Sequence, residues 1–200
     1  MKLYYAPGAC SLSPHITLRE AELPFELAKT DTKTKVLGDG SDYRLINPKG
    51  YVPCLELDNG ELLTEGPAIV QYIADRVPAK KLAPEPGNFQ RYRLQEWLNY
   101  ITSELHKNYG ALFVPSTPED YKLIARDRLA FRYELIDATL AKQPYLLGAF
   151  SVADPYLFVV TTWAPRLGVN LDRFRAVAAF QGRMRERPAV MAALRAEGLA

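Results

Sequence analysis

Residues 52–69 read VPCLELDNGELLTEGPAI and carry the signals that decide the fold. Asp-Asn-Gly at 58–60 lies between two short apolar runs, which is a strong sequence signal for a β-hairpin. After the second run, apolar residues recur at helical spacing over 65–77. The stretch therefore predicts two antiparallel strands followed by a helix.

The residues before this stretch add a second pattern. A short strand is expected at 2–5, a helix over 12–22 with Pro14 in its first turn, and another strand at 24–29. A helical crossover implies that the first two strands are parallel, whereas the hairpin makes the sheet mixed. This order is that of a thioredoxin-like domain, an α/β fold expected to span residues 1–78.

The second half of the chain shows almost only helical patterns. Residues 79–87 hold prolines, lysines and a glycine and are expected to form a linker. A long helix is expected over 89–113, and Ser151 with Asp154 has the spacing of a capping box at the start of a later helix. Residues 88–200 are therefore expected to be an all-α domain.

Composition and charge exclude several classes of function. Hydrophobic residues make up 48% of the chain, enough for a buried core, and the formal net charge is only +2. No basic run alternates with aromatics, so nucleic acid is not an expected partner. No apolar stretch is long enough for a membrane span, and no signal-peptide core follows Met1. With two cysteines, too few for a disulfide scaffold, we expect a cytoplasmic protein with reduced thiols.

The segment GACSLSPH at 8–15 places a lone cysteine between an expected strand and an expected helix. The N–H groups and the dipole of a helix start favour an anion, so Cys10 is expected to have a lowered pKa. It is then a nucleophile or a thiol-binding group, and the alternative is a small residue in a turn. Because Ser13 stands three positions on, a disulfide within this loop is excluded.

The hairpin stretch contains two further candidates. Val52-Pro53 stands at the entry of a strand. Its peptide bond is either cis, in which case the backbone beside it pairs with an extended peptide, or that of an ordinary proline in an edge strand. Glu65 and Gly66 open a helix, where N–H groups suit a carboxylate and the Glu65 side chain suits an ammonium. The alternative is an ordinary acidic helix start.

A polar stripe lies on the long helix. Asn99, Ser103 and His106 are spaced i, i+4 and i+7, so they share a face that is offset from the leucines. The stripe is either part of a binding site or a solvated flank. His15, within the first helix, is expected to be structural.

Together these residues resemble the bacterial beta-class glutathione S-transferases along the whole chain. The blocks that carry the resemblance are KLYYAPGACSLSPHITLRE, NPKGYVPCLELDNGELLTEGPAIVQYIAD, EWLNYITSELHKNYGALF, SVADPYLF and RPAVMAALRAEGL. The resemblance implies a homodimer with one glutathione site per subunit. Its reaction serves either detoxification or one step of a degradation pathway. Glutathione is then a co-substrate, and neither another cofactor nor a metal is expected.

The resemblance also implies which groups contact or activate the glutathione sulfur. Cys10 is expected to contact it, and His106 is expected to tune the thiolate. Ser11 is a third candidate donor. Tyr5 is a rival donor only if it does not belong to the core. Cys54, the second thiol, is expected to be structural.

The remaining glutathione contacts are likewise implied by the resemblance. Lys35 is expected near the glycine carboxylate, and the backbone of Val52, before a cis Pro53, is expected to pair with the tripeptide. Glu65 and Gly66 are expected to hold the γ-glutamyl end, although many family members carry a serine at the second position, so here only the backbone donates. The helical domain, in part that of the partner subunit, is expected to contribute Asn99, Ser103, Glu104, Leu105 and His106.

The expected reaction is attack of the glutathione thiolate on a small hydrophobic electrophile. Its pocket is expected around Pro7, Ala9, Tyr109, Phe113 and Trp163. One alternative is a glutathione-dependent thiol transferase, peroxidase or reductive dehalogenase that works through a Cys10–glutathione disulfide. Another is a non-catalytic ligand-binding protein, which would tolerate the loss of Lys35, Glu65 or His106. All three residues are present, which favours an enzyme.

Overall fold

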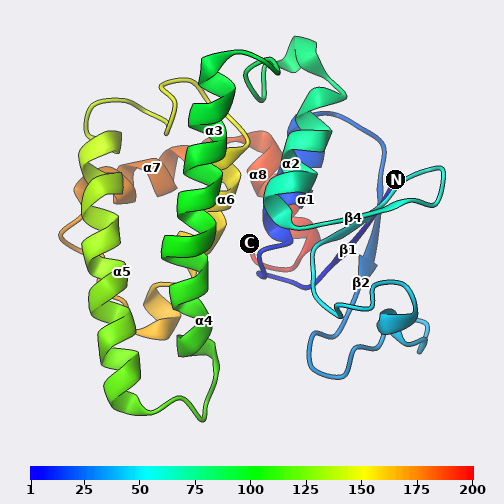
Figure 1. Ribbon diagram of the computed structural model, residues 1–200, viewed down its shortest axis with the longest axis horizontal. Coiled ribbons are helices and arrows are strands. Elements are labelled where there is room, and N and C mark those ends of the chain that lie inside the picture. Colours follow the sequence, from blue (N-terminus) through cyan, green and yellow to red (C-terminus); the bar gives the residue numbers. More distant parts are fainter. The chain divides into compact units, whose positions relative to one another are not determined.

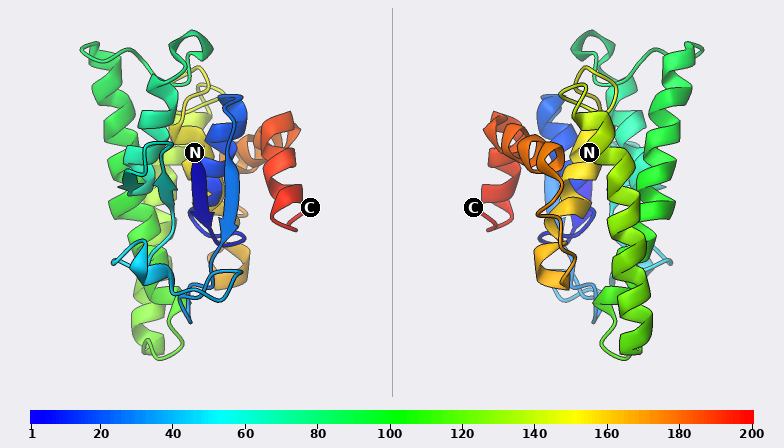
Figure 2. Two further views of the ribbon diagram at one scale, coloured as in Figure 1. Left: turned by 90° about the vertical axis from the view of Figure 1, so that its right-hand side faces the viewer. Right: turned by 90° about the vertical axis from the view of Figure 1, so that its left-hand side faces the viewer.

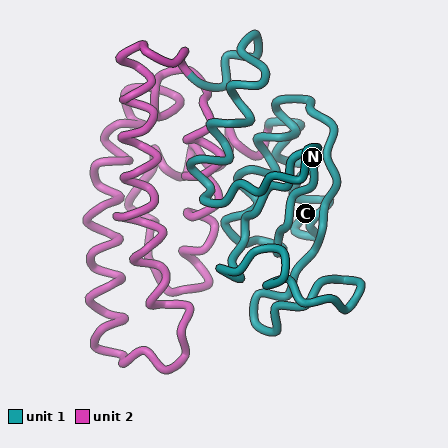
Figure 3. Tube along the Cα trace, turned by 45° about the vertical axis from the view of Figure 1, so that its right-hand side comes forward, with its two compact units in different colours: residues 1–83, 187–200 teal, residues 84–186 magenta.

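The computed structural model describes residues 1–200, which form two compact units (Figure 3). Unit 1 comprises residues 1–83 and 187–200, and unit 2 comprises residues 84–186. This differs from the expected division at 78 and 88 chiefly at the C-terminus, because the last helix packs on the first helix of the chain. The division into functional domains stays a prediction.

The four strands of unit 1 form one mixed sheet with the order β2-β1-β3-β4 (Figure 1). The strands are β1 (Lys2–Tyr5), β2 (Glu26–Lys29), β3 (Cys54–Glu56) and β4 (Leu62–Thr64). The β1–β2 pair is parallel, whereas β1–β3 and β3–β4 are antiparallel. The expected mixed sheet, including the hairpin around Asp-Asn-Gly, is therefore confirmed.

Three helices complete unit 1 and pack side by side. They are α1 (Leu12–Glu20), α2 (Gly66–Asp75) and α8 (Pro188–Ala196). α1 packs against both of the others, and it lies beside α8 in both views of Figure 2. Short 3-10 turns occur at η1 (Tyr43–Leu45) and η2 (Pro78–Lys80). The apolar stripes of α1 and α2 are buried as expected, including Ile16, Leu18, Ile69 and Ile73.

Unit 2 is helical throughout, which confirms the expected all-α part of the fold. Its elements are α3 (Phe89–Tyr100), η3 (Ile101–His106), α4 (Lys107–Phe113), α5 (Glu119–Leu140), α6 (Ala153–Thr162), η4 (Pro165–Leu167) and α7 (Arg175–Glu186). The expected single helix over 89–113 is continuous, but η3 is a π-helical turn within it. Such turns are frequent at functional sites.

The start of α6 is fixed by one buried carboxylate. Asp154 accepts from the N–H and the hydroxyl of Ser151, at 2.7 and 3.1 Å, and from the N–H of Leu146 at 3.0 Å. The acidic half of the expected capping box is thus present, while the Ser151 hydroxyl donates to the carboxylate instead of capping the helix. The contact holds α6 in place within unit 2.

Candidate active site

The Cys10 thiol lies in the loop between β1 and α1 and meets the segment before β3. Cys10 Sγ donates to the carbonyl oxygen of Val52 over 3.3 Å, and the side chain is half-buried. Backbone turns within the loop shape this approach, with Leu12 N–H donating to the carbonyl of Ala9 at 3.0 Å. Two candidates separated widely in the sequence, Cys10 and Val52, are thus brought together.

The charge state of Cys10 differs from the expectation. Burial raises the pKa of its thiol to about 12, and the nearby Glu65 carboxylate acts in the same direction. The N–H groups of Cys10 and Ser11 lower it, as the helix-start argument requires, but their effect is smaller. The expected lowered pKa is therefore wrong, and in this structure the Cys10 thiol is a hydrogen-bond donor.

The Val52-Pro53 peptide bond is cis, as the resemblance implied. The residue before it is held firmly, because the carbonyl of Tyr51 accepts from Tyr43 Oη and from Asn47 Nδ2, both at 2.9 Å. The N–H group of Val52 takes no part in the hydrogen bonds of the chain. The Val52 backbone therefore offers an unused donor beside the Cys10 thiol.

Two lysines flank this backbone segment. Lys35 Nζ donates to the carbonyl of Gly50 at 2.8 Å and lies 5.5 Å from the centre of the Tyr51 ring. Lys49 was not singled out in the sequence, because a lysine in a polar loop has no informative spacing. Its Nζ donates to Thr64 Oγ1 and pairs with Glu65 Oε1, both at 2.9 Å.

Glu65 and Gly66 lie where α2 begins, as expected. Glu65 is the N-terminal flanking residue of α2 with a φ of 70°, and its carboxylate is exposed. A Cβ at Gly66 would meet only Pro53 Cγ, at 4.0 Å, so the site has room for the serine that many family members carry. The helix start and the cis proline are therefore neighbours.

The polar stripe of unit 2 is present but not uniform. Asn99 and Ser103 are exposed, and Ser103 Oγ donates to the carbonyl of Asn99 at 3.0 Å. Glu104 forms an ion pair with Arg132 from α5. Leu105 is fully buried, so its side chain belongs to the core and only its backbone is available to a ligand.

His106 is half-buried and turned toward α6. Its Nδ1 lies 2.7 Å from the hydroxyl of Tyr156, and its ring packs edge-on against Trp163 with centroids 5.0 Å apart. Trp163 also packs against Tyr109 and Phe113, at 5.7 and 5.3 Å. The three aromatic residues expected around the electrophile do gather within unit 2. Tyr156 was missed, since nothing in the sequence links it to His106.

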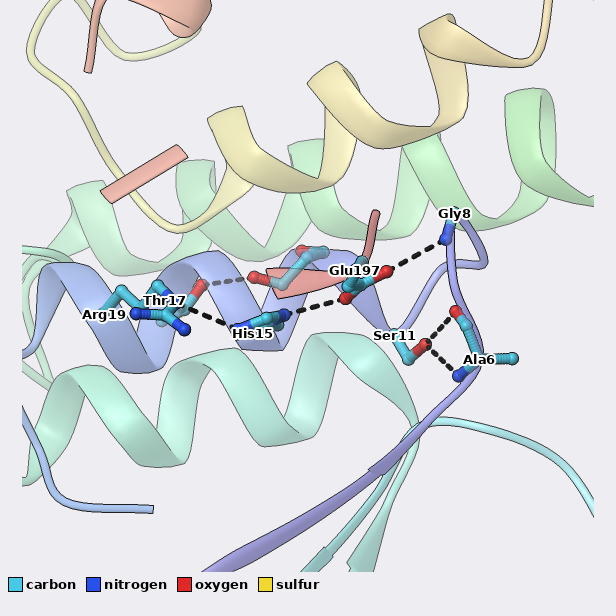
Figure 4. Close-up of polar contacts among 8 residues, drawn as sticks. Ala6, Gly8, Ser11, His15, Thr17, Arg19 and Glu197 are labelled. Atoms are coloured by element: carbon cyan, nitrogen blue, oxygen red, sulfur yellow. Dashed lines mark hydrogen bonds and ion pairs between the residues drawn. The ribbon is translucent and has the colours of Figure 1, made fainter. Parts of the chain in front are cut away.

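The side chains of Tyr5 and Ser11 are buried, so neither hydroxyl is available as a donor to a ligand. Tyr5 is buried, and burial, with the charge of Glu197, raises its pKa. Ser11 is fully buried and turns back to Ala6, accepting from its N–H at 3.1 Å and donating to its carbonyl at 3.2 Å (Figure 4). Ser11 therefore neither caps α1 nor faces outward, and its role is to close the loop.

His15 is structural, as expected, and belongs to a buried relay (Figure 4). Arg19 Nε donates to His15 Nε2 at 2.9 Å, and His15 Nδ1 lies 2.8 Å from Glu197 Oε1. The other oxygen of Glu197 accepts from the N–H of Gly8 at 2.9 Å. Because an arginine Nε always carries a proton, the His15 proton is on Nδ1. The relay ties the loop of Cys10 to the C-terminal segment.

A mixed sheet of this order with a cis proline beside a thiol defines the thioredoxin-like class. Family models described as the glutathione S-transferase N-terminal and C-terminal domains match residues 8–76 and 91–188. Glutathione S-transferase GstA of Escherichia coli O157:H7 is 49% identical over 200 residues, with 100% of both chains covered. The chain belongs to the glutathione S-transferase family.

Solved structures agree with this assignment. BphK, described as a bacterial glutathione S-transferase in a ternary complex, is 56% identical with a TM-score of 0.98, and all of both chains is covered. The bacterial beta-class enzyme of Sphingomonas chungbukensis is 43% identical with a TM-score of 0.97, again over 100% of each chain. The resemblance to the beta class is therefore confirmed. No helix of the structure is both long and apolar enough to cross a membrane.

Proposed function

We propose that this glutathione S-transferase conjugates reduced glutathione to small hydrophobic electrophiles, and that glutathione lies along the Val52 backbone in unit 1. One observation carries the proposal: Val52 offers an unused N–H beside its carbonyl, and the Cys10 thiol lies 3.3 Å from that carbonyl. An extended peptide pairs with such a segment as an added strand would. The cysteine of the bound tripeptide then reaches the Cys10 loop.

Charge complementarity supports this orientation. Glutathione carries a carboxylate at its glycine end and both an ammonium and a carboxylate at its γ-glutamyl end. Lys35, whose Nζ donates to the carbonyl of Gly50, suits the glycine carboxylate. At the other side, the N-terminus of α2 at Gly66 suits a carboxylate, and Glu65 suits the ammonium.

The protonation state of Cys10 favours conjugation over reactions through a mixed disulfide. A mixed disulfide needs the Cys10 thiolate as a nucleophile, and burial disfavours this thiolate because it raises the pKa of the thiol. A neutral thiol donates a hydrogen bond to the glutathione thiolate instead. The sulfur that attacks the electrophile is accordingly that of glutathione.

The helical unit supplies the other half of the proposal. His106 donates to the glutathione sulfur, and Asn99, Ser103 and Glu104 line the site, in the same subunit or its partner. The aromatic cluster of Tyr109, Phe113 and Trp163 receives the electrophile, with Pro7 and Ala9 from the Cys10 loop. A homodimer that works in the cytoplasm and detoxifies electrophiles completes the proposal.

The test is the rate of glutathione conjugation to chlorodinitrobenzene by the wild type, Cys10→Ala and Cys10→Ser. A donor role predicts a loss of about tenfold in Cys10→Ala, the worth of one hydrogen bond to a charged group. Cys10→Ser keeps a donor and stays within about threefold of the wild type. No wild-type rate above background contradicts conjugation, and an inactive Cys10→Ser contradicts the donor role.

A further inference from the structure

Tyr156 and His106 form a short contact whose direction of donation has chemical consequences. Tyr156 lies in the first half of α6 and is buried, and its hydroxyl is 2.7 Å from His106 Nδ1. The same hydroxyl is 3.4 Å from Thr102 Oγ1 in the π-helical turn. Thr102 Oγ1 also lies 2.8 Å from the carbonyl oxygen of Leu98, to which it donates its single proton.

Distance and acidity together favour Tyr156 as the donor in the short contact. A separation of 2.7 Å is at the short end for an N–H donor to oxygen, whose hydrogen bonds are most often about 2.9–3.0 Å long. A phenol is also a stronger donor than an imidazole N–H, and an unprotonated ring nitrogen is a stronger acceptor than a phenol oxygen. A tyrosine that donates to His106 Nδ1 leaves the proton of the neutral imidazole on Nε2.

We propose that Tyr156 is a positioning residue that fixes His106 in the tautomer protonated on Nε2. Granting the proposed function of His106, the imidazole then donates a hydrogen bond to the glutathione thiolate and is not the base that deprotonates the thiol. The basic lone pair on Nδ1 is already occupied by Tyr156. When the S–H bond of glutathione breaks, the proton therefore passes to water, and the electron pair stays on sulfur.

The packing around the ring supports a fixed orientation. Tyr156 is also in edge-on ring contact with His106, with centroids 5.9 Å apart, and Trp163 packs on the same ring at 5.0 Å. Two aromatic neighbours thus restrain the rotation that would exchange the ring nitrogens. The π-helical turn, which ends at His106, brings the histidine and Thr102 to the same tyrosine.

The direct test is a long-range ¹H–¹⁵N NMR spectrum of the uniformly labelled protein. The chain has only two histidines, and a His106→Gln variant assigns their signals. His15 is an internal reference of the opposite kind, because Arg19 donates to its Nε2. We expect a single Nε2–H form for His106 and an Nδ1–H form for His15. An Nδ1–H form of His106, or an even mixture, overturns the proposal.

Two variants extend the test to function. Tyr156→Phe keeps the ring but removes the donor. His106 should then sample both tautomers, and kcat should fall about tenfold with KM for glutathione within twofold. Thr102→Val removes the 3.4 Å contact with Tyr156 and the bond to the carbonyl of Leu98, but keeps the contact between Tyr156 and His106, so it should leave the tautomer unchanged.

A shifted tautomer in Thr102→Val would mean that Tyr156 donates to the threonine, which contradicts the assignment. Unchanged spectra and kcat in Tyr156→Phe would equally exclude a positioning role. If Tyr156→Phe does not fold, the wild-type spectrum still decides the tautomer. A wild type that fails to bind glutathione would refute the proposed function, while the tautomer result would stand on its own.

Discussion

The two histidines of the chain, one in each unit, show how surroundings set the use of the same side chain. His15 is fully buried, and the chain itself supplies a donor to one ring nitrogen and an acceptor to the other, Arg19 and Glu197. His106 is half-buried, with Nδ1 held by Tyr156 and its ring against Trp163. The first arrangement stabilises a fold, and the second orients a ring for chemistry.

The largest effect should come from breaking the relay of unit 1. In His15→Ala the buried Glu197 carboxylate loses its imidazole partner, which should lower the free energy of unfolding by about 3 kcal/mol or more. Denaturant unfolding with tryptophan fluorescence measures this. The matched variant His106→Ala should cost only about 1 kcal/mol, since its histidine is half-buried. Equal losses in the two variants would refute the distinction between the histidines.

The effects on kcat should have the reverse order, with the larger loss in His106→Ala and the smaller loss in His15→Ala. Removing one hydrogen-bond donor that stabilises an anion in an active site lowers kcat by about 10²-fold. His106→Ala should therefore lower kcat by about 10²-fold. The measurement is conjugation of chlorodinitrobenzene at saturating glutathione. His15→Ala, assayed at a temperature where it is fully folded, should keep kcat within about threefold. A His106→Ala enzyme with nearly wild-type kcat would remove His106 from the mechanism.

A third comparison concerns how the reactivities of the Cys10 and Cys54 thiols change with pH. Because burial raises the pKa of Cys10 to about 12, its thiolate fraction should grow about tenfold per pH unit from pH 7 to 9. Iodoacetamide labelling followed by mass spectrometry reports this rate. Cys54, which is fully buried and whose pKa is also raised by burial, serves as the slow reference. A Cys10 rate that levels off below pH 7 would restore the lowered pKa expected from the sequence.

The smallest effect is expected at Lys49, whose ammonium occupies the Glu65 carboxylate that we assign to glutathione. Lys49→Met should tighten glutathione binding about two- to fivefold, because Lys49 then no longer competes with the glutathione ammonium for the Glu65 carboxylate. The factor is small because an exposed ion pair is weak. Calorimetric titration gives the dissociation constants. Lys33→Met, in the same exposed loop, is the matched control and should change nothing. Weaker binding in Lys49→Met would place this lysine on a glutathione carboxylate instead.

The features that the sequence predicted are those fixed by short stretches of chain. The Asp-Asn-Gly turn and the buried leucine stripe of the long helix each depend on neighbours within a few residues, whereas the cis bond at Val52-Pro53 was implied only by the family resemblance. The recognised blocks added the candidate residues around Cys10. Local patterns and long ordered motifs were sufficient for the class of fold and for the family.

The features that the sequence missed depend on distant partners. Glu197 is 182 residues from His15, and Tyr156 is 50 residues from His106, so no spacing reveals either pair. The π-helical turn keeps the apolar stripe buried and therefore leaves no mark on the periodicity. The sign of the Cys10 pKa shift was wrong because burial, a tertiary property, outweighs the local helix start.

The central claim is that neutral donors, Cys10 and His106, stabilise a glutathione thiolate. The most direct measurement is the pKa of the thiol of enzyme-bound glutathione, followed by thiolate absorbance in the ultraviolet as pH is varied. The account predicts a value at least one unit below that of free glutathione, with part of the shift lost in His106→Ala. A bound thiol that titrates as it does in free glutathione would contradict the account.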